Sequence, residues 1–176
     1  GIAGGDYATG KKGVTLMSAQ VFQGNSTASS FQNAIVWGAD NGAVISQNSW
    51  GNDYDFDGNG VLSAYEKDYA LRDRISSSMA AAIDYFIAYA GCDKDGNQKP
   101  DSPMKGGLVV FAAGNDGIAN GVPASYAPVI AVGASGMTGR LSSFSNYGSW
   151  VDICAPGESI YSCVASGSYD RYQGTS

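Results

Sequence analysis

Short apolar runs alternate with helical segments along this chain, and this alternation restricts its fold more than any other feature. The runs predict strands at 14–22, 43–47, 108–112, 129–132, 151–154 and 160–164. Because strands that alternate with helices form parallel sheets, the sequence predicts an α/β domain with a mainly parallel sheet. Two runs, 108–112 and 129–132, are apolar throughout, which predicts strands buried on both faces.

Two helices are predicted, over 29–39 and 65–90. Thr27 or Ser29 is placed to cap the first helix, which is expected to end at Asn41-Gly42. In the second segment apolar residues recur on one helical face: Ile75, Met79, Ile83, Phe86 and Ile87. Gly91 is the expected left-handed residue after it.

Length and charge exclude several classes of function. The 176 residues suffice for one domain, 1–176, with polar insertions at 52–66 and 92–106. A net charge of −6 argues against a nucleic-acid partner, because Lys and Arg are too few to neutralise a row of phosphates. No run of about 20 apolar residues exists, so no membrane span is predicted. Cys154 and Cys163 are placed to bridge across the turn at Gly157, and the alternative is that all the cysteines are free thiols.

Two polar residues stand where chemistry is possible. Asn115 follows the strand predicted at 108–112, and a carboxamide at the carboxyl end of a parallel strand faces the crevice that binds ligands. There it can donate to a developing oxyanion, although an Asn before a turn is by itself commoner as a structural residue. Ser176 ends the triplet Gly174-Thr175-Ser176, which taken alone fits a helix cap as well as a nucleophile.

In their order and spacing, the motifs of this chain resemble the subtilisin-like serine proteases, the subtilases of peptidase family S8. The resemblance runs over nearly the whole chain. The matching segments are Asn48-Ser49-Trp50-Gly51, Ala112-Ala113-Gly114-Asn115, the stretch 123–134, Phe144-Ser145-Asn146-Tyr147-Gly148, Asp152-Ile153-Cys154-Ala155-Pro156-Gly157 and Gly174-Thr175-Ser176. The resemblance implies a subtilisin-like three-layer domain, incomplete in this fragment.

The resemblance also implies roles for these residues. Ser176 would be the nucleophile and Asn115 the oxyanion donor. One wall of the specificity pocket, which also pairs with substrate backbone, would be Asn48, Ser49, Trp50 and Gly51. The opposite wall would be Ala112, Ala113 and Gly114. For Trp50, packing in the core is the alternative to substrate contact. Polypeptide substrate is expected to lie extended between 48–51 and 24–27.

No histidine occurs among the 176 residues. A hydrolase serine without an imidazole has no ordinary general base. In subtilases the catalytic Asp and His precede the strand that corresponds to 14–22. The resemblance therefore implies part of a secreted endopeptidase, inactive alone and dependent on the N-terminal part of its own domain. The alternative is a non-catalytic module that binds calcium or peptides.

A twelve-residue stretch at 55–66 resembles an EF-hand calcium loop. Oxygen ligands are expected from Asp55, Asp57, Asn59, the Val61 carbonyl, Ser63 and Glu66, with Gly60 at the sharp turn. No incoming helix precedes it, which favours one structural calcium over a calcium sensor. The alternative is an acidic surface turn.

A second acidic stretch follows the pattern less well. Its candidate ligands are Asp93, Asp95, Asn97 and Asp101, but the glycine and the glutamate of the motif are missing. Two lysines, Lys94 and Lys99, offset part of its charge. Calcium binding and a solvated loop remain equal alternatives there.

Overall fold

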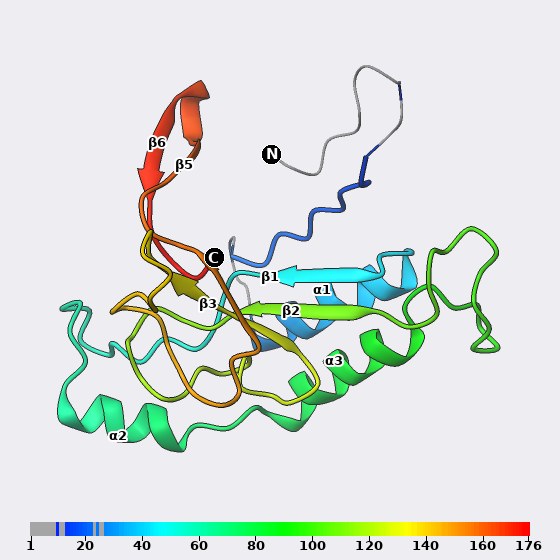
Figure 1. Ribbon diagram of the computed structural model, residues 1–176. Helices are drawn as coiled ribbons and strands as arrows, with labels where there is room; N and C mark the ends of the chain where they lie inside the picture. The colour runs from blue at the N-terminus through cyan, green and yellow to red at the C-terminus, as the bar shows by residue number, and fades with distance from the viewer. Residues whose placement is uncertain (1–9, 11–12, 23, 25–26) are drawn as a thin grey trace.

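A four-stranded parallel sheet forms the centre of the computed structural model, which describes residues 10, 13–22, 24 and 27–176 (Figure 1). The strands follow one another in spatial order: β1 (Ile45–Asn48), β2 (Leu108–Ala112), β3 (Ile130–Ser135) and β4 (Ile153–Pro156). Every neighbouring pair is parallel. The predicted α/β class with a parallel sheet is confirmed. Strand β2 lies at its predicted bounds, and the ends of β1, β3 and β4 are displaced by one to three residues.

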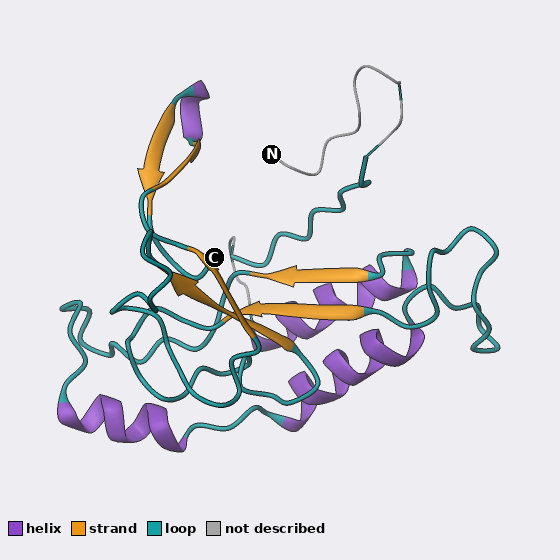
Figure 2. Cartoon of the chain, in the orientation of Figure 1, coloured by secondary structure: helices purple, strands orange, loops and turns teal. Residues whose placement is uncertain are grey.

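Helices α1 (Ala28–Asp40) and α3 (Ser77–Tyr89) pack together against the sheet (Figures 1 and 2). Their apolar stripes and the inward residues of β2 and β3 form the main core, whose largest members are Ile35, Ile83, Phe86, Val109 and Phe111. Leu108 on β2 is 43% exposed, so the prediction that this strand is buried on both faces is wrong. Among the described residues no helix has the length and apolar character needed to cross a membrane.

The caps of α1 agree with the sequence. Thr27 occupies the N-cap position with extended backbone. At the other end the Asn41 N–H donates to the Trp37 carbonyl and the Gly42 N–H donates to the Ala39 carbonyl. Gly42 follows with a φ of 94°, a conformation that favours glycine. Gly91 after α3 likewise has a φ of 69°, as predicted.

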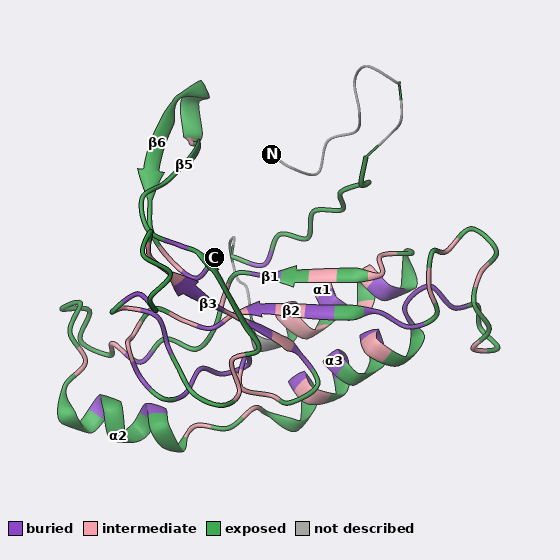
Figure 3. Cartoon of the chain, viewed as in Figure 1, coloured by how far each residue is buried: buried purple, intermediate pink, exposed green. Residues whose placement is uncertain are grey.

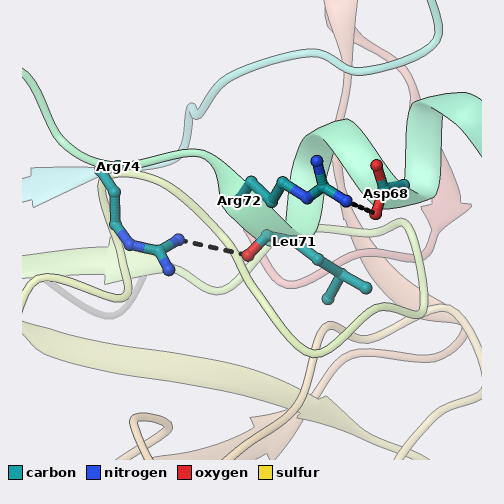
Figure 4. A network of polar contacts seen from close by, with 4 residues as sticks. All are labelled: Asp68, Leu71, Arg72 and Arg74. Carbon is teal, nitrogen blue, oxygen red and sulfur yellow. Dashed lines mark hydrogen bonds and ion pairs between the residues drawn. The ribbon is translucent and has the colours of Figure 1, made fainter.

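The prediction of one helix over 65–90 is wrong, because the segment forms two helices. Helix α2 (Ala64–Arg72) stops at Asp73, whose backbone is extended, and Ser76 caps the new helix α3 by accepting from the Met79 N–H. The Asp73 carboxylate accepts from the Asn52 amide and the Tyr54 hydroxyl, contacts that hold it outside a helix. Figure 4 shows the end of α2, where Arg72 pairs with Asp68 at 2.7 Å and the Arg74 guanidinium donates to the Leu71 carbonyl at 3.2 Å.

The prediction of a strand over 14–22 is also wrong. The described residues of this segment are extended but have no ladder partner, and Figure 3 shows most of the segment exposed. Leu16 is 77% exposed, whereas Val21 is buried. An apolar run becomes a strand only when a neighbour accepts its backbone hydrogen bonds, and the described residues supply none.

A small hairpin stands away from the main sheet (Figures 1 and 3). It joins β5 (Ile160–Cys163) to β6 (Tyr169–Tyr172) through the short helix η1 (Ala165–Gly167), and all its strand residues are exposed. Tyr161 and Tyr169 stack across it with ring centroids 5.6 Å apart. Cys154 and Cys163 form no bridge, and each is an exposed free thiol, while Cys92 is buried.

Candidate active site

The carboxyl ends of β1 and β2 and the C-terminal segment enclose a cleft of about 200 Å³. Sequence reasoning placed seven of its lining residues there: Ser49, Trp50, Gly51, Ala112, Ala113, Gly114 and Asn115. Ser176 lines the same cleft, next to Thr175. Figure 1 shows the C-terminus beside the carboxyl ends of these strands. The fold therefore brings the candidate nucleophile and the candidate oxyanion donor to one surface.

Thr175 fixes the orientation of the Asn115 carboxamide. Its backbone N–H and its hydroxyl both donate to Asn115 Oδ1, at 2.9 Å and 3.0 Å. The Thr175 hydroxyl also accepts from the Gly114 N–H at 3.1 Å. Because Oδ1 is held by two donors, Nδ2 is the end of the carboxamide left to donate to an anion.

A close backbone approach holds the segment that carries Ser176. The Gly174 N–H donates to the Gly157 carbonyl at 2.9 Å, which ties this segment to the end of β4. A Cβ at Gly157 would lie 2.6 Å from the Gly174 oxygen and 2.5 Å from the Ala134 Cβ. Both distances are shorter than real contacts allow, so only glycine fits at position 157.

Asn146 organises the loop around Asn115, and sequence reasoning did not single it out. It is completely buried, and its Oδ1 accepts from the N–H groups of Asp116 and Ile118 at 2.9 Å and 3.2 Å. Its Nδ2 donates to Asp116 Oδ2 at 3.2 Å. Its position inside the matching motif at 144–148 was the available signal, but the partners became visible only in three dimensions.

Asp116 is a half-buried acid at the edge of the cleft. Desolvation raises the pKa of its carboxyl above the usual value, and the hydrogen bond from Asn146 opposes this rise. The negative charges of Asp53 and Asp55 raise the pKa further. Asp116 and Asp53, which both line the cleft, therefore give it a negative charge.

Two residues predicted to bind substrate have side chains that make contacts inside the molecule. Asn48 is 7% exposed and is absent from the cleft; its amide donates to Ser46 and to the Val110 carbonyl. Trp50 packs on Phe31 and Phe111, with ring centroids 4.6 Å and 4.9 Å apart, and also lines the cleft. The second substrate edge predicted at 24–27 includes residues 25–26, which lie outside the described part of the chain.

The loop at 55–66 gathers three carboxylates. Oxygen atoms of Asp55, Asp57 and Glu66 lie within 4.8 Å of one another. The Asp55 carboxylate accepts from the Asn59 and Gly60 N–H groups, and the latter contact is 2.7 Å. The lone pairs of these carboxylate oxygens that do not accept a hydrogen bond can bind a cation. This cluster of oxygens therefore fits a hard divalent ion.

Glu66 closes this loop from the first turn of α2. Its two oxygens accept from the N–H groups of Phe56 and Ser63, at 2.8 Å and 2.7 Å. Hydrogen bonds from Ser63 and Phe56 lower the pKa of its carboxyl below the usual value. The glutamate is therefore ionised at neutral pH and joins the loop to the helix.

The second acidic stretch holds its backbone in a similar way. Asp93 Oδ1 accepts from the Asp95 and Asn97 N–H groups, each at 2.9 Å, and hydrogen bonding to Asn97 lowers the Asp93 pKa. Within the described residues these acids form no three-carboxylate cluster. Asp101 takes part in none of these contacts.

A serine and an asparagine thus lie together at the carboxyl ends of a parallel sheet. The family model of the subtilase family matches residues 1–176, and the chain belongs to that family. The predicted family and the subtilisin-like fold are both confirmed.

Individual relatives agree with this assignment. The chain is 53% identical over 73 residues to the thermophilic serine proteinase of Bacillus sp. (strain AK1), covering 41% of this chain and 18% of the relative. It is 44% identical over 81 residues to the extracellular protease of Xanthomonas campestris pv. campestris, covering 41% of this chain and 14% of the relative. The solved structure of the prenylagaramide maturation protease PagA superposes with a TM-score of 0.60 and 27% identity, covering 88% of this chain and 47% of that one. The chain thus spans less than half the length of these proteins.

Proposed function

We propose that this chain carries the nucleophile, the oxyanion donor and part of the substrate cleft of a secreted subtilisin-like endopeptidase. The observation that carries the proposal is the contact of Thr175 with Asn115, which places the amide of Asn115 and Ser176 at one cleft. The relative from Xanthomonas, described as an extracellular protease, supports secretion. Polypeptides are the proposed substrates.

The proposed reaction is acyl transfer. Ser176 Oγ attacks the carbonyl carbon of the scissile peptide bond and loses its proton to a general base. The tetrahedral oxyanion accepts hydrogen bonds from Asn115 Nδ2 and the Ser176 N–H. The C–N bond then breaks, the amine leaves with the proton, and water hydrolyses the ester on Ser176.

These residues contain no histidine, so the proposed general base is an imidazole from outside them. We expect the isolated chain to retain only the rate that oxyanion stabilisation and binding provide, about 10³–10⁴ over water. The measurement is hydrolysis of casein and labelling by a fluorophosphonate. Labelling of the isolated chain at the rate of an intact serine protease would overturn this part of the proposal.

The oxyanion role of Asn115 is tested in the complete protease that contains this chain. Asn115→Ala is expected to lower kcat by about 10²–10³ and to change KM little. This magnitude was measured on a subtilisin and is taken over here. Ser176→Ala is expected to abolish acyl-enzyme formation. An Asn115→Ala enzyme with unchanged kcat would exclude the proposed role.

We further propose that the loop at 55–66 binds one structural calcium through Asp55, Asp57, Asn59, the Val61 carbonyl, Ser63 and Glu66. The clustered carboxylates and the positive φ of Gly58 and Gly60 support it. Calcium should raise Tm. Asp55→Ala should remove most of this increase in Tm. Asp101→Ala, in the second acidic stretch, should leave the increase unchanged. An unchanged Tm after chelation contradicts the proposal.

A non-catalytic binding module is the second candidate, favoured by the missing histidine. The coding sequence upstream of Gly1 separates the two functions. A subtilase aspartate motif and a histidine motif there support the peptidase, and their absence supports the module. A mass measurement of the native protein would show whether they lie on a separate chain.

A further inference from the structure

Two carboxylates and no cationic side chain line the described cleft beside Ser176. Asp53 comes from the loop after β1, and Asp116 from the loop after β2. They therefore reach the cleft from its two opposite walls. The apolar part of the lining includes Trp50, Ala112 and Val122.

Asn146 holds the Asp116 carboxylate in place and leaves one of its oxygens available. Oδ2 accepts from Asn146 Nδ2 at 3.2 Å, while no hydrogen bond to Oδ1 occurs within the described part of the chain. Asp116 has lost part of its hydration and lies near the negative charge of Asp53, and both effects raise its pKa. A cation in the cleft would relieve both effects.

The nearby basic residues leave this charge largely uncompensated. Arg72 pairs with Asp68, and Arg74 donates to the Leu71 carbonyl, as Figure 4 shows. Lys67 lines an adjoining cavity together with Asp53 and Asp116, but forms no ion pair within the described residues. In the described part of the chain, Lys67 is thus the basic side chain that shares a cavity with these two carboxylates.

We propose that this cleft takes a lysine or arginine side chain from the residue that precedes the scissile bond, with Asp116 and Asp53 as its counter-charges. This preference rests on the proposed peptidase function. The aliphatic stem of such a side chain suits the apolar surface of Trp50 and Val122, and its cationic end suits the two carboxylates.

The test compares kcat/KM of the complete protease on peptide nitroanilides that differ only in the residue before the scissile bond: lysine, arginine, leucine, phenylalanine or glutamate. Lysine and arginine substrates should exceed leucine by about tenfold or more. Asp116→Asn should lower kcat/KM for lysine about a hundredfold, and Asp53→Asn about tenfold, with leucine changed less than about threefold. Asp53→Lys should favour the glutamate substrate over lysine.

The matched control is Asp101→Asn, which removes the same charge from an exposed position outside the cleft and should leave every ratio unchanged. Equal losses on all substrates for Asp116→Asn would show that it acts on the Asn115 loop rather than on specificity. The inference is wrong if Asp116→Asn loses equally on all substrates and Asp53→Asn keeps the wild-type preference for lysine. If the wild-type enzyme prefers leucine, the inference is wrong but the proposed peptidase function stands. If it hydrolyses none of the substrates, the proposed function itself is wrong.

Discussion

At the scale of single residues, the site depends on side chains that hold other side chains. Asn115 and Ser176 were predicted from their motifs, but the contact through Thr175 was not. The partners lie 60 residues apart in sequence, and the contact depends on the backbone path of both loops. Asn146 escaped prediction for the same reason, because its partners on 114–118 are defined by the fold alone.

Thr175→Val tests the first of these contacts in the complete protease. The substitution keeps the shape of the side chain and removes the hydroxyl that donates to Asn115 Oδ1. We expect kcat to fall about tenfold and KM to stay within about twofold, because the Asn115 amide is then less firmly oriented for the transition state. Thr175→Ser, which keeps the hydroxyl, should retain most of kcat; equal losses in the two variants would contradict this account.

At the scale of elements, hydrophobic spacing predicted where apolar segments lie better than where they begin and end. Strand β2 and helix α1 were found almost at their predicted bounds. The break between α2 and α3 was missed because the carboxylate of Asp73 turns toward Asn52 and Tyr54, and no spacing rule reports such a contact. The segment at 14–22 has the composition of a strand, but ladder partners decide whether it becomes one.

Helix α2 supplies a prediction about pH. The pKa of Glu66 is lower in the folded chain than its usual 4.5, so its stabilising contacts with Phe56 and Ser63 are complete above that value. They are lost as pH falls through the lowered pKa. With chelator present, Glu66→Gln should lower Tm at pH 7, and the difference from wild type should shrink below about pH 4. A difference that is constant from pH 7 to pH 3, measured by thermal melts, would contradict this.

At the scale of the whole molecule, burial is distributed unevenly. The sheet with α1 and α3 forms one core, whereas both faces of the β5–β6 hairpin are exposed (Figure 3). Isolated two-stranded hairpins are marginally stable in water. The fold therefore combines a stable centre with an arm that opens easily.

Hydrogen exchange measures this difference directly. Amides of β5 and β6 should exchange about 10³ times faster than those of β2 and β3, because opening the hairpin exposes little buried apolar surface. Residues 153–156 on the sheet edge should lie between the two. Comparable protection of the hairpin and β2 would mean that the hairpin is covered in solution.

Trp50 gives the molecule a built-in optical reporter. Its indole packs against Phe31 with tilted rings and against Phe111 edge to face, and Trp50 also lines the cleft beside Ser176. The ring therefore senses both the packing of the core and the contents of the cleft. Its fluorescence should shift when a peptide displaces water from the cleft, so binding can be followed without a label and without turnover.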